Sequence, residues 1–581
     1  MTTTCQPEPA TTPRQAGRFG RTARLDAGAM LAYLAIAAFV TAGLWPSPGT
    51  RALAVNPADQ TLTEWFLAQG ARFWTGDLSL VSDRMNSPEG INLLANATNL
   101  LSGIVLAPVT FLFGAPVSFA VLVAANLAGT ASGWYLLFAR GFRLHRAGAA
   151  AGGLFCGFAP AMLSQSNSHL HITAQILIPL IVYCVLRLTR AQTPVRTGVA
   201  LGLLIALQLF AGEEVLFLTA LTLALLTLSY AVVGWQQLRA ALRPLGIGLG
   251  VAAGLAIVLL GYPLWVQFAG RQSVPNGLFP PSYFSADLAS YLAYSPYSLA
   301  GSEESVRLAP NATEMNTFLG WPLLLVVAAC TGYLFQSAYV RAALVTGLIA
   351  AGLSFGPEIV VGGERTGVAG PYVLLEGLPV VDGALPSRFA LILVPLIAGL
   401  LALTVHEAMQ AADLSRYVMT GGIALALVPL LPVQLGTVSR PEVPGFFSAG
   451  HWEKCVRPGG VLVPVPLPTP AAPEPLRWAT AANVAFGVPE GFFIGPYGAE
   501  GRAAMGVYSQ PTAALLHEVH QKGTVPVIGP PEREQAQRDA RYWNASCITL
   551  GPSTFHDELK LTLDGLYGQG ERIAGVWVWR V

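Results

Sequence analysis

The stretch VNPADQTLTEWFLAQGARFWTGD (residues 55–77) follows almost directly on the first apolar run of the chain. Asn56 can cap a helix and Pro57 suits its first turn, which makes Asp59 the third helical residue. Apolar and aromatic side chains then recur every three to four positions, and Trp65 suits the boundary between lipid and water. The stretch therefore predicts an amphipathic interfacial helix that carries an early carboxylate, with Glu64 on its solvated face.

The composition is typical of a polytopic α-helical membrane protein. The chain has 581 residues, of which 53% are hydrophobic and 11% are charged, and its mean hydropathy is +0.53. Soluble domains are about 25% charged. Several runs of about 17–25 apolar residues are long enough to cross a bilayer. The net charge of +1 gives no sign of a nucleic-acid partner, and we expect none.

Basic residues predict the orientation of the spans. Four Arg between residues 14 and 24 precede the first span, which places the tail 1–26 in the cytoplasm. The segment 99–114 contains Pro108 and is short for a span. If it crossed, RGFRLHR (140–146) would face outward, against the positive-inside rule. We therefore expect 99–114 to be interfacial or re-entrant.

If residues 99–114 do not cross the membrane, every inner loop is short and carries at least one Arg, and the long polar loops all lie on the other side. The layout predicts about eleven transmembrane helices within residues 27–435. The expected outer loops are 46–116, 270–318 and 357–387. An odd number of spans places the tail 436–581 outside the cell.

That tail predicts a small α/β domain, because strand-like runs such as VLVPVPLP (461–468) alternate with helical patterns such as PTAALLHEVHQKG (511–523). It contains neither GxGxxG nor GxxxxGK[ST], the usual phosphate-binding motifs. A packing or recognition module is the favoured interpretation. A disulfide between Cys455 and Cys547 is left open, because spacing does not establish proximity.

A family resemblance enters with the arrangement of the first outer loop. A first span, an early acid, a Trp-bearing helix and a P-x-G-x-N segment together resemble membrane glycosyltransferases of the GT-C superfamily. The matching residues are Asp59, Gln60, Trp65 and SPEGIN (87–92), and more loosely Phe158-Ala159-Pro160 with SQSNSHLH (164–171).

The resemblance implies a sugar donor carried on polyprenyl phosphate or pyrophosphate, and it implies that Asp59 is a base or metal ligand. Many members carry two adjacent acids where this chain has Ala58-Asp59. The cofactor is therefore left open, with a divalent cation such as Mg²⁺ or Mn²⁺ as the candidate, and no further metal ligand is assigned.

Other polar residues are candidates for substrate binding on the same side. His169 and His171 lie in a polar break between two spans, where a His is either functional or bonded to backbone. Glu213 and Glu214 stand where two spans meet, and they either join Asp59 over a cation or face water.

The lipid phosphate is expected at Arg271 and Arg388, because a guanidinium donates two parallel hydrogen bonds to phosphate. The alternative for each is an interfacial anchor. Asp287 and Glu314 are candidates for contacting the acceptor.

The favoured function is therefore a glycosyltransferase of the bacterial cytoplasmic (inner) membrane. It would move a sugar from the polyprenyl-linked donor to an extracytoplasmic glycan, lipid or protein, among membrane lipids. A transporter or flippase is the first alternative, but the predicted spans carry almost no charge at their centres. A non-catalytic scaffold of envelope assembly is the second.

Overall fold

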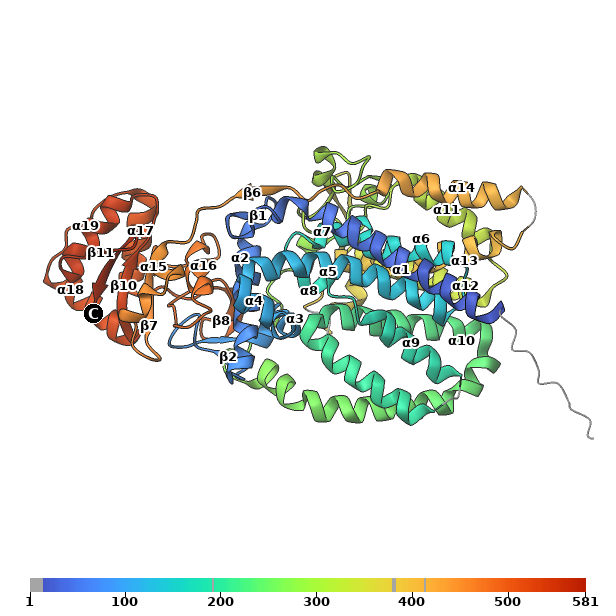
Figure 1. Cartoon of the computed structure of the whole chain (residues 1–581), viewed down its shortest axis with the longest axis horizontal. Helices are drawn as coiled ribbons and strands as arrows, with labels where there is room; N and C mark the ends of the chain where they lie inside the picture. The colour runs from blue at the N-terminus through green and yellow to red at the C-terminus, as the bar shows by residue number, and fades with distance from the viewer. Residues whose placement is uncertain (1–13, 191–192, 379–382, 412–413) are drawn as a thin grey trace, which may run out of the picture.

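The computed structural model describes residues 14–190, 193–378, 383–411 and 414–581. A helical bundle occupies most of the molecule and a separate α/β domain extends from one end of it (Figure 1). The bundle helices are α1 Arg14–Val40, α5 Ala115–Leu136, α6 Arg146–Phe158, α7 Pro160–Gln165, α8 Leu170–Thr173, α9 Ile178–Thr189, α10 Pro194–Ala269, α11 Trp321–Tyr333, α12 Ala338–Ser354, α13 Leu393–Ala408 and α14 Ser415–Leu427.

The bundle has the character of a multi-pass membrane protein. Among the described residues, six helical stretches are long and apolar enough to cross a bilayer, and three shorter apolar helices accompany them. Non-helical backbone at Gly212 and Gly234 divides the 76-residue α10 into three segments. The apolar pattern predicts spans at about residues 197–211, 215–234 and 245–269, and the three segments overlap these ranges. The total of eleven crossings stays a prediction.

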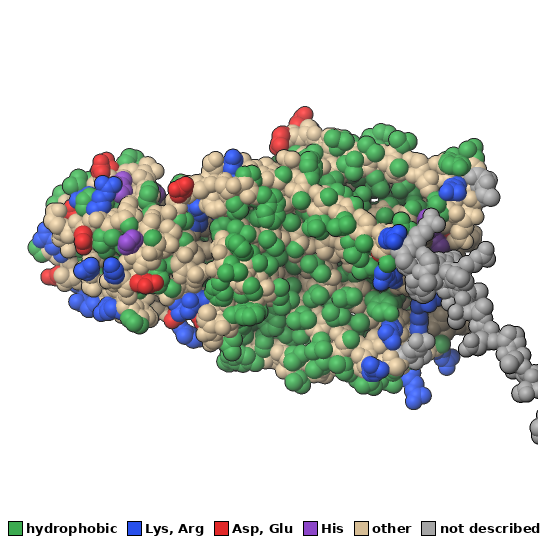
Figure 2. Space-filling view, viewed as in Figure 1, with side chains coloured by type: hydrophobic (Ala, Val, Ile, Leu, Met, Phe, Trp, Pro, Cys, Tyr) green, Lys and Arg blue, Asp and Glu red, His purple; other side chains and the backbone are tan. Residues whose placement is uncertain are grey.

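The surface divides into zones that fit this class. Figure 2 shows a broad hydrophobic band over the bundle, basic side chains at the end far from the α/β domain, and charges of both signs on that domain. At the basic end, Asp26 accepts hydrogen bonds from Arg140 and Arg146, whose Nη2 and Nε lie 2.7 and 2.9 Å from its oxygens. This pairing offsets the burial of Asp26, which is 2% exposed.

The segment 99–114 forms two short helices, α3 Leu100–Val105 and α4 Ala107–Phe113. Neither is long enough to span a bilayer. Val105, Leu112 and Phe113 are each more than 60% exposed. The structure thus gives this segment the short, apolar-faced form that an interfacial position requires.

The C-terminal α/β domain contains a four-stranded sheet in the order β11-β12-β10-β7. Strands β7 and β10 are parallel and fully buried, whereas the other two pairs are antiparallel. Strand β7 lies within the predicted strand 461–468 and helix α17 within the predicted helix 511–523, whereas α15, α16, β8, β9 and β11 were not predicted. Their bounds are β7 Val461–Val465, β8 Ile494–Tyr497, β9 Arg502–Met505, β10 Ala545–Leu550, β11 Glu571–Ile573, β12 Val576–Arg580, α15 Gly445–Ser448, α16 Glu474–Ala481, α17 Pro511–Lys522, α18 Pro530–Tyr542 and α19 His556–Tyr567.

The first outer loop and the segment after α14 are joined by a small antiparallel sheet. Strand β1 (Arg51–Leu53) pairs with β6 (Thr437–Ser439). Beside it lies α2 (Pro57–Ala71), between the bundle and the α/β domain (Figure 1). The remaining short strands of the outer loops are β2 Val81–Ser82, β3 Ile91–Asn92, β4 Glu358–Val361 and β5 Glu364–Ala369.

The expected helix at 55–77 is present, but the expected places of Trp65 at the boundary of lipid and water and of Glu64 on a solvated face are wrong. Trp65 is 0% exposed and packs into an apolar core that includes Phe446, Leu462 and Phe493 of the C-terminal region. Glu64 is also buried, and its carboxylate accepts a hydrogen bond from Arg440 at 2.6 Å. Contacts distant in sequence cover both residues, which local periodicity does not reveal.

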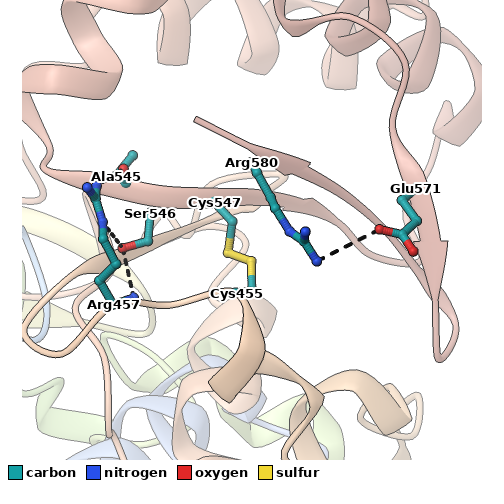
Figure 3. The surroundings of a disulfide bond; sticks show 7 residues. All are labelled: Cys455, Arg457, Ala545, Ser546, Cys547, Glu571 and Arg580. Atoms are coloured by element: carbon teal, nitrogen blue, oxygen red, sulfur yellow. Dashed lines mark hydrogen bonds and ion pairs between the residues drawn. A yellow bond between two sulfur atoms is a disulfide. The ribbon is translucent and has the colours of Figure 1, made fainter.

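The open question about Cys455 and Cys547 is answered by a disulfide that links the segment before β7 to strand β10 (Figure 3). Arg457 donates to the backbone oxygen of Ala545 and reinforces the same junction.

We expect the denatured, unreduced protein to take up maleimide on four of its six cysteines and the reduced protein on all six. Mass spectrometry counts the labels, and six labels before reduction would contradict the bond.

Candidate functional site

The N-terminus of α2 positions Asp59. Asn56 caps this helix, because its Oδ1 accepts from the backbone N–H of Asp59 at 3.2 Å. The Nδ2 of Asn56 also donates to Asp59 Oδ2 at 2.6 Å. Ser168 Oγ donates to the backbone oxygen of Asn56 at 3.1 Å, which joins the cap to the polar turn before α8. The cap therefore fixes both the start of the helix and the direction of the carboxylate.

His169 lies between two carboxylates. Its Nε2 is 3.4 Å from Asp59 Oδ2, and its Nδ1 is 3.4 Å from Glu314 Oε1. The Glu314 side chain is 0% exposed. Burial lowers the pKa of His169, but hydrogen bonds to Asp59 and Glu314 outweigh this effect and raise the pKa to about 9.

The hydrogen-bond pattern independently places protons on both ring nitrogens. Gln165 Nε2 donates to Glu314 Oε2 and Asn316 Oδ1, both at 2.9 Å, so Gln165 Oε1 faces His169 Nδ1 as an acceptor at 3.0 Å. Nδ1 must then donate. Nε2 faces an Asp59 carboxylate, which only accepts when ionised. His169 is therefore an imidazolium whose Nε2 faces the Asp59 carboxylate.

Arg388 completes a row of alternating charges. The row runs from Asp59 through His169, Glu314 and Arg388 to Glu214. The Nη2 and Nη1 of Arg388 each lie 2.5 Å from a carboxylate oxygen, of Glu314 and Glu214 respectively. Burial raises the pKa of Glu314, but Arg388 and His169 more than offset this and hold the pKa below its ordinary value. Arg388 is 7% exposed, so its charge is committed to these two partners.

The break of α10 at Gly212 places Glu213 and Glu214 next to this row of charges. Gly212 has a φ of 176° and a ψ of 98°, and a Cβ there would lie 2.0 Å from the backbone oxygen of His171. Gln208 supports the break by donating to the backbone oxygens of Ala174 and Gly212 at 3.0 and 3.2 Å. The residue after the break, Glu213, accepts from Gln267 at 2.8 Å.

A cavity of about 150 Å³ adjoins the row of charges. Residues 94–99, His171 and 209–214 line it. The His171 ring lies 6.0 Å from that of His169, and its Nε2 is 4.0 Å from Glu214 Oε2. The cavity is thus connected to Asp59 through two neighbouring imidazoles.

The structure brings six of the sequence-predicted residues together at this place, and Glu213 lines the cavity. The six are Asp59, His169, His171, Glu214, Glu314 and Arg388. Two others lie elsewhere. Arg271 is exposed and donates to the backbone oxygen of Glu89 at 3.0 Å, beside the loop that lines the cavity. Asp287 is 2% exposed, and its carboxylate accepts from the backbone N–H groups of Ala289, Gly362 and Gly363.

Sequence reasoning missed Gln165 and Asn316 and did not single out Asn99. The first two orient Glu314 by hydrogen bonds of 2.8–2.9 Å. Their signal was present, since each lies within four positions of a predicted site residue in a polar stretch. Asn99 carried no such signal, because it opens the short apolar segment and only the fold places it against α10.

The donor set does not fit a divalent cation. Among the described residues, no three His, Cys, Asp or Glu side chains converge in a way that could hold a metal ion. The oxygens of Glu314 are occupied by Arg388, Gln165 and Asn316, and an imidazolium faces Asp59. We therefore derive no step through a metal.

The charge on His169 predicts a pH dependence. Its pKa is about 9 in the folded protein and about 6.5 when unfolded. The stability that it contributes is complete below pH 6.5 and is lost as the pH rises through 9. The melting temperature of the wild type should thus exceed that of His169→Gln most at pH 6 and least at pH 10. The control is His451→Gln, at a remote exposed position, whose melting temperature should differ from that of the wild type by the same amount at every pH. If the difference for His169→Gln were also independent of pH, His169 would not carry the assigned charge.

The fold and site together describe a multi-pass membrane protein with a buried charge cluster and a cavity at one end of its bundle. No family model and no curated protein matches the sequence. Solved structures do match. The apo oligosaccharyltransferase of Archaeoglobus fulgidus aligns with a TM-score of 0.45 and 11% identity, covering 90% of this chain and 69% of that one.

A second structure of that archaeal enzyme, AglB in complex with an inhibitory peptide and a dolichol-phosphate, aligns with the same TM-score and coverage at 12% identity. The arabinofuranosyltransferase AftD from Mycobacteria aligns with a TM-score of 0.47 and 14% identity, covering 95% of this chain and 41% of that one. Both proteins are GT-C glycosyltransferases, the superfamily that the first outer loop resembles.

Proposed function

We propose that the protein transfers a sugar from a polyprenyl-linked donor to an acceptor hydroxyl or amide, with Asp59 as the general base. The observation that carries this proposal is the Asp59 carboxylate, which accepts a hydrogen bond from the helix-capping Asn56, is 26% exposed and lies 3.4 Å from the imidazolium of His169. A positioned carboxylate within reach of a substrate proton accelerates its transfer by about 10²–10⁴-fold.

In the reaction, the acceptor oxygen or nitrogen attacks the anomeric carbon of the donor sugar, and its proton passes to a carboxylate oxygen of Asp59. The bond between the anomeric carbon and the phosphate oxygen breaks, and the phosphate leaves with the electron pair. His169 and Asn56 orient the Asp59 carboxylate until the proton arrives. The anomeric configuration inverts, because there is one displacement.

Arg271 is our candidate for the lipid phosphate. Its exposed guanidinium makes one hydrogen bond, to Glu89, beside the loop that lines the cavity. Arg388 is less suited, because two carboxylates already bind it. Glu314, which orients His169 and Arg388, is a positioning residue in this scheme.

We place the site and the α/β domain outside the cytoplasmic membrane. The disulfide between Cys455 and Cys547 supports this orientation, because disulfides persist in oxidising compartments. The Arg-rich far end of the bundle supports it as well, through the positive-inside rule. The expected partners are the lipid-linked donor, an extracytoplasmic acceptor and membrane lipids.

The test is transfer in proteoliposomes supplied with lipid-linked sugars extracted from cells that lack the protein. We expect Asp59→Asn to lower kcat about 100-fold or more. The matched control is Asp83→Asn, which removes the same charge from an exposed position of the same loop and should keep activity within about twofold. If Asp59→Asn turned over at the wild-type rate, Asp59 would not be the base. If the wild-type protein transferred no sugar, the transferase would be excluded and the transporter and the scaffold would be the remaining functions.

A further inference from the structure

The cavity beside the charge row has the size of one small ring. Its volume is about 150 Å³. An apolar cavity of about that volume accommodates a benzene ring. A single pyranose or furanose ring therefore fits, whereas a disaccharide does not.

The lining of this cavity presents hydrogen-bond acceptors that find no partner among the described residues. Asn99 is 4% exposed, and its Oδ1 accepts no hydrogen bond. Glu214 Oε1 is likewise buried and unpartnered, although its other oxygen binds Arg388. Leaving a buried acceptor unsatisfied is unfavourable by about 1–3 kcal/mol. Both atoms therefore point to a ligand that donates hydrogen bonds.

The charge of the lining limits the kind of ligand. Glu213 and Glu214 line the cavity, and no Lys or Arg is among the described residues that do so. The two cations of the row, His169 and Arg388, each lie between two carboxylates. A carboxylate on the ligand ring would meet like charges here. Apolar groups from Leu94, Leu209 and neighbouring residues cover the rest of the wall.

We propose that this cavity binds the single sugar ring of the donor, and that it selects a neutral or amino sugar over an acidic one. The hydroxyl or ammonium groups of the ring donate to Asn99 and Glu214, and Glu213 supplies a further acceptor. The apolar wall packs against the C–H face of the ring. This inference rests on the proposed transferase function and names the substrate class of the same site.

The competing ligand is a divalent cation, which also seeks acceptors. The lining disfavours it, because one oxygen of Glu213 accepts from Gln267 and one of Glu214 binds Arg388. In addition, no metal-binding group of three ligands forms among the described residues. A ring-sized space with scattered acceptors suits a polyol better.

The experiment measures binding of methyl glycosides to the full-length protein in nanodiscs by saturation-transfer NMR. The probes are neutral hexosides and pentosides, the matching 2-amino-2-deoxy glycosides and the matching uronides. We expect at least one neutral or amino glycoside to bind at least 10-fold more tightly than its uronide. Equal binding of uronides, absence of binding by every probe, or displacement by millimolar Mg²⁺ or Mn²⁺ would each overturn the inference.

Two variants assign the binding to the named groups. Asn99 has a φ of 47°, so Asn99→Gly removes the acceptor without straining the backbone, and we expect about 10-fold weaker glycoside binding. The matched control is Asn544→Gly, at a φ of 54° on the exposed surface of the α/β domain, which should bind as the wild type does. Glu213→Lys should shift the preference toward uronides.

The outcomes also separate this inference from the proposed function. Wild-type transfer in proteoliposomes with no effect of Asn99→Gly or Glu213→Lys on sugar choice would overturn the cavity assignment and leave the transferase intact. Glycoside binding with the expected selectivity but no transfer would support the cavity and overturn the transferase.

Discussion

Replacing Arg388 with methionine is expected to destabilise the protein by about 3–5 kcal/mol. Arg388 is buried between Glu314, whose side chain is 0% exposed, and Glu214. Without the guanidinium, the buried carboxylate of Glu314 and the half-buried carboxylate of Glu214 are left with only His169 to compensate. A buried charge that loses its partner is unfavourable by several kcal/mol, whereas methionine itself fits the space. The melting temperature and the yield of monodisperse protein in detergent measure the effect.

Two further variants make this result specific. Arg365→Met breaks an exposed ion pair with Glu358, which should matter by less than about 1 kcal/mol. Adding Glu314→Gln to Arg388→Met should restore part of the lost stability, because it removes one of the orphaned charges. If Arg388→Met melts at the wild-type temperature, the ion pairs of Arg388 with Glu314 and Glu214 do not stabilise the fold.

Gly212→Ala is expected to disable the site through the backbone. A Cβ at this position would lie 2.0 Å from the oxygen of His171, and a backbone atom cannot move aside as a flexible side chain can. The segment of α10 that carries Glu213 and Glu214 must then shift away from α8. A displacement of about 1 Å near reacting groups lowers rates by about 100-fold, so we expect at least that loss of transfer in proteoliposomes.

The same helix offers the control for this prediction. An added Cβ at Gly250 meets nothing within 4 Å, so Gly250→Ala should leave activity unchanged and stabilise α10 slightly. Transfer by Gly212→Ala at the rate of Gly250→Ala would show that the break does not position the acidic pair.

The sequence predicted well whatever depends on local pattern. Apolar length marked the helices of the bundle, and Asn56 with Pro57 marked the start of α2. Gly523, at a φ of 64°, ends α17 where the glycine predicts it. Strand β7 appeared as a short apolar run between glycine and proline. These signals act within a few residues and need no knowledge of the fold.

The failures all depend on contacts between distant parts of the chain. Arg440 neutralises Glu64 and the C-terminal region covers Trp65, so neither residue faces solvent or lipid as their local pattern indicated. Glu314 was singled out, but its bonds to Gln165 and Arg388 follow only from packing. The carboxylate of Asp287 binds the turn between β4 and β5, a contact that the local pattern does not reveal either, and its role at the acceptor stays a prediction.

The pairing of β1 with β6 bears on how the protein is made. The strand that follows the first span finds its partner only after α14 has been synthesised. The core around Trp65 needs residues up to Val578, almost the last of the chain. Asp59, the proposed general base, therefore emerges early from the ribosome but reaches its final surroundings only after strand β12 has been synthesised, so products truncated before β12 should carry no working site into the membrane.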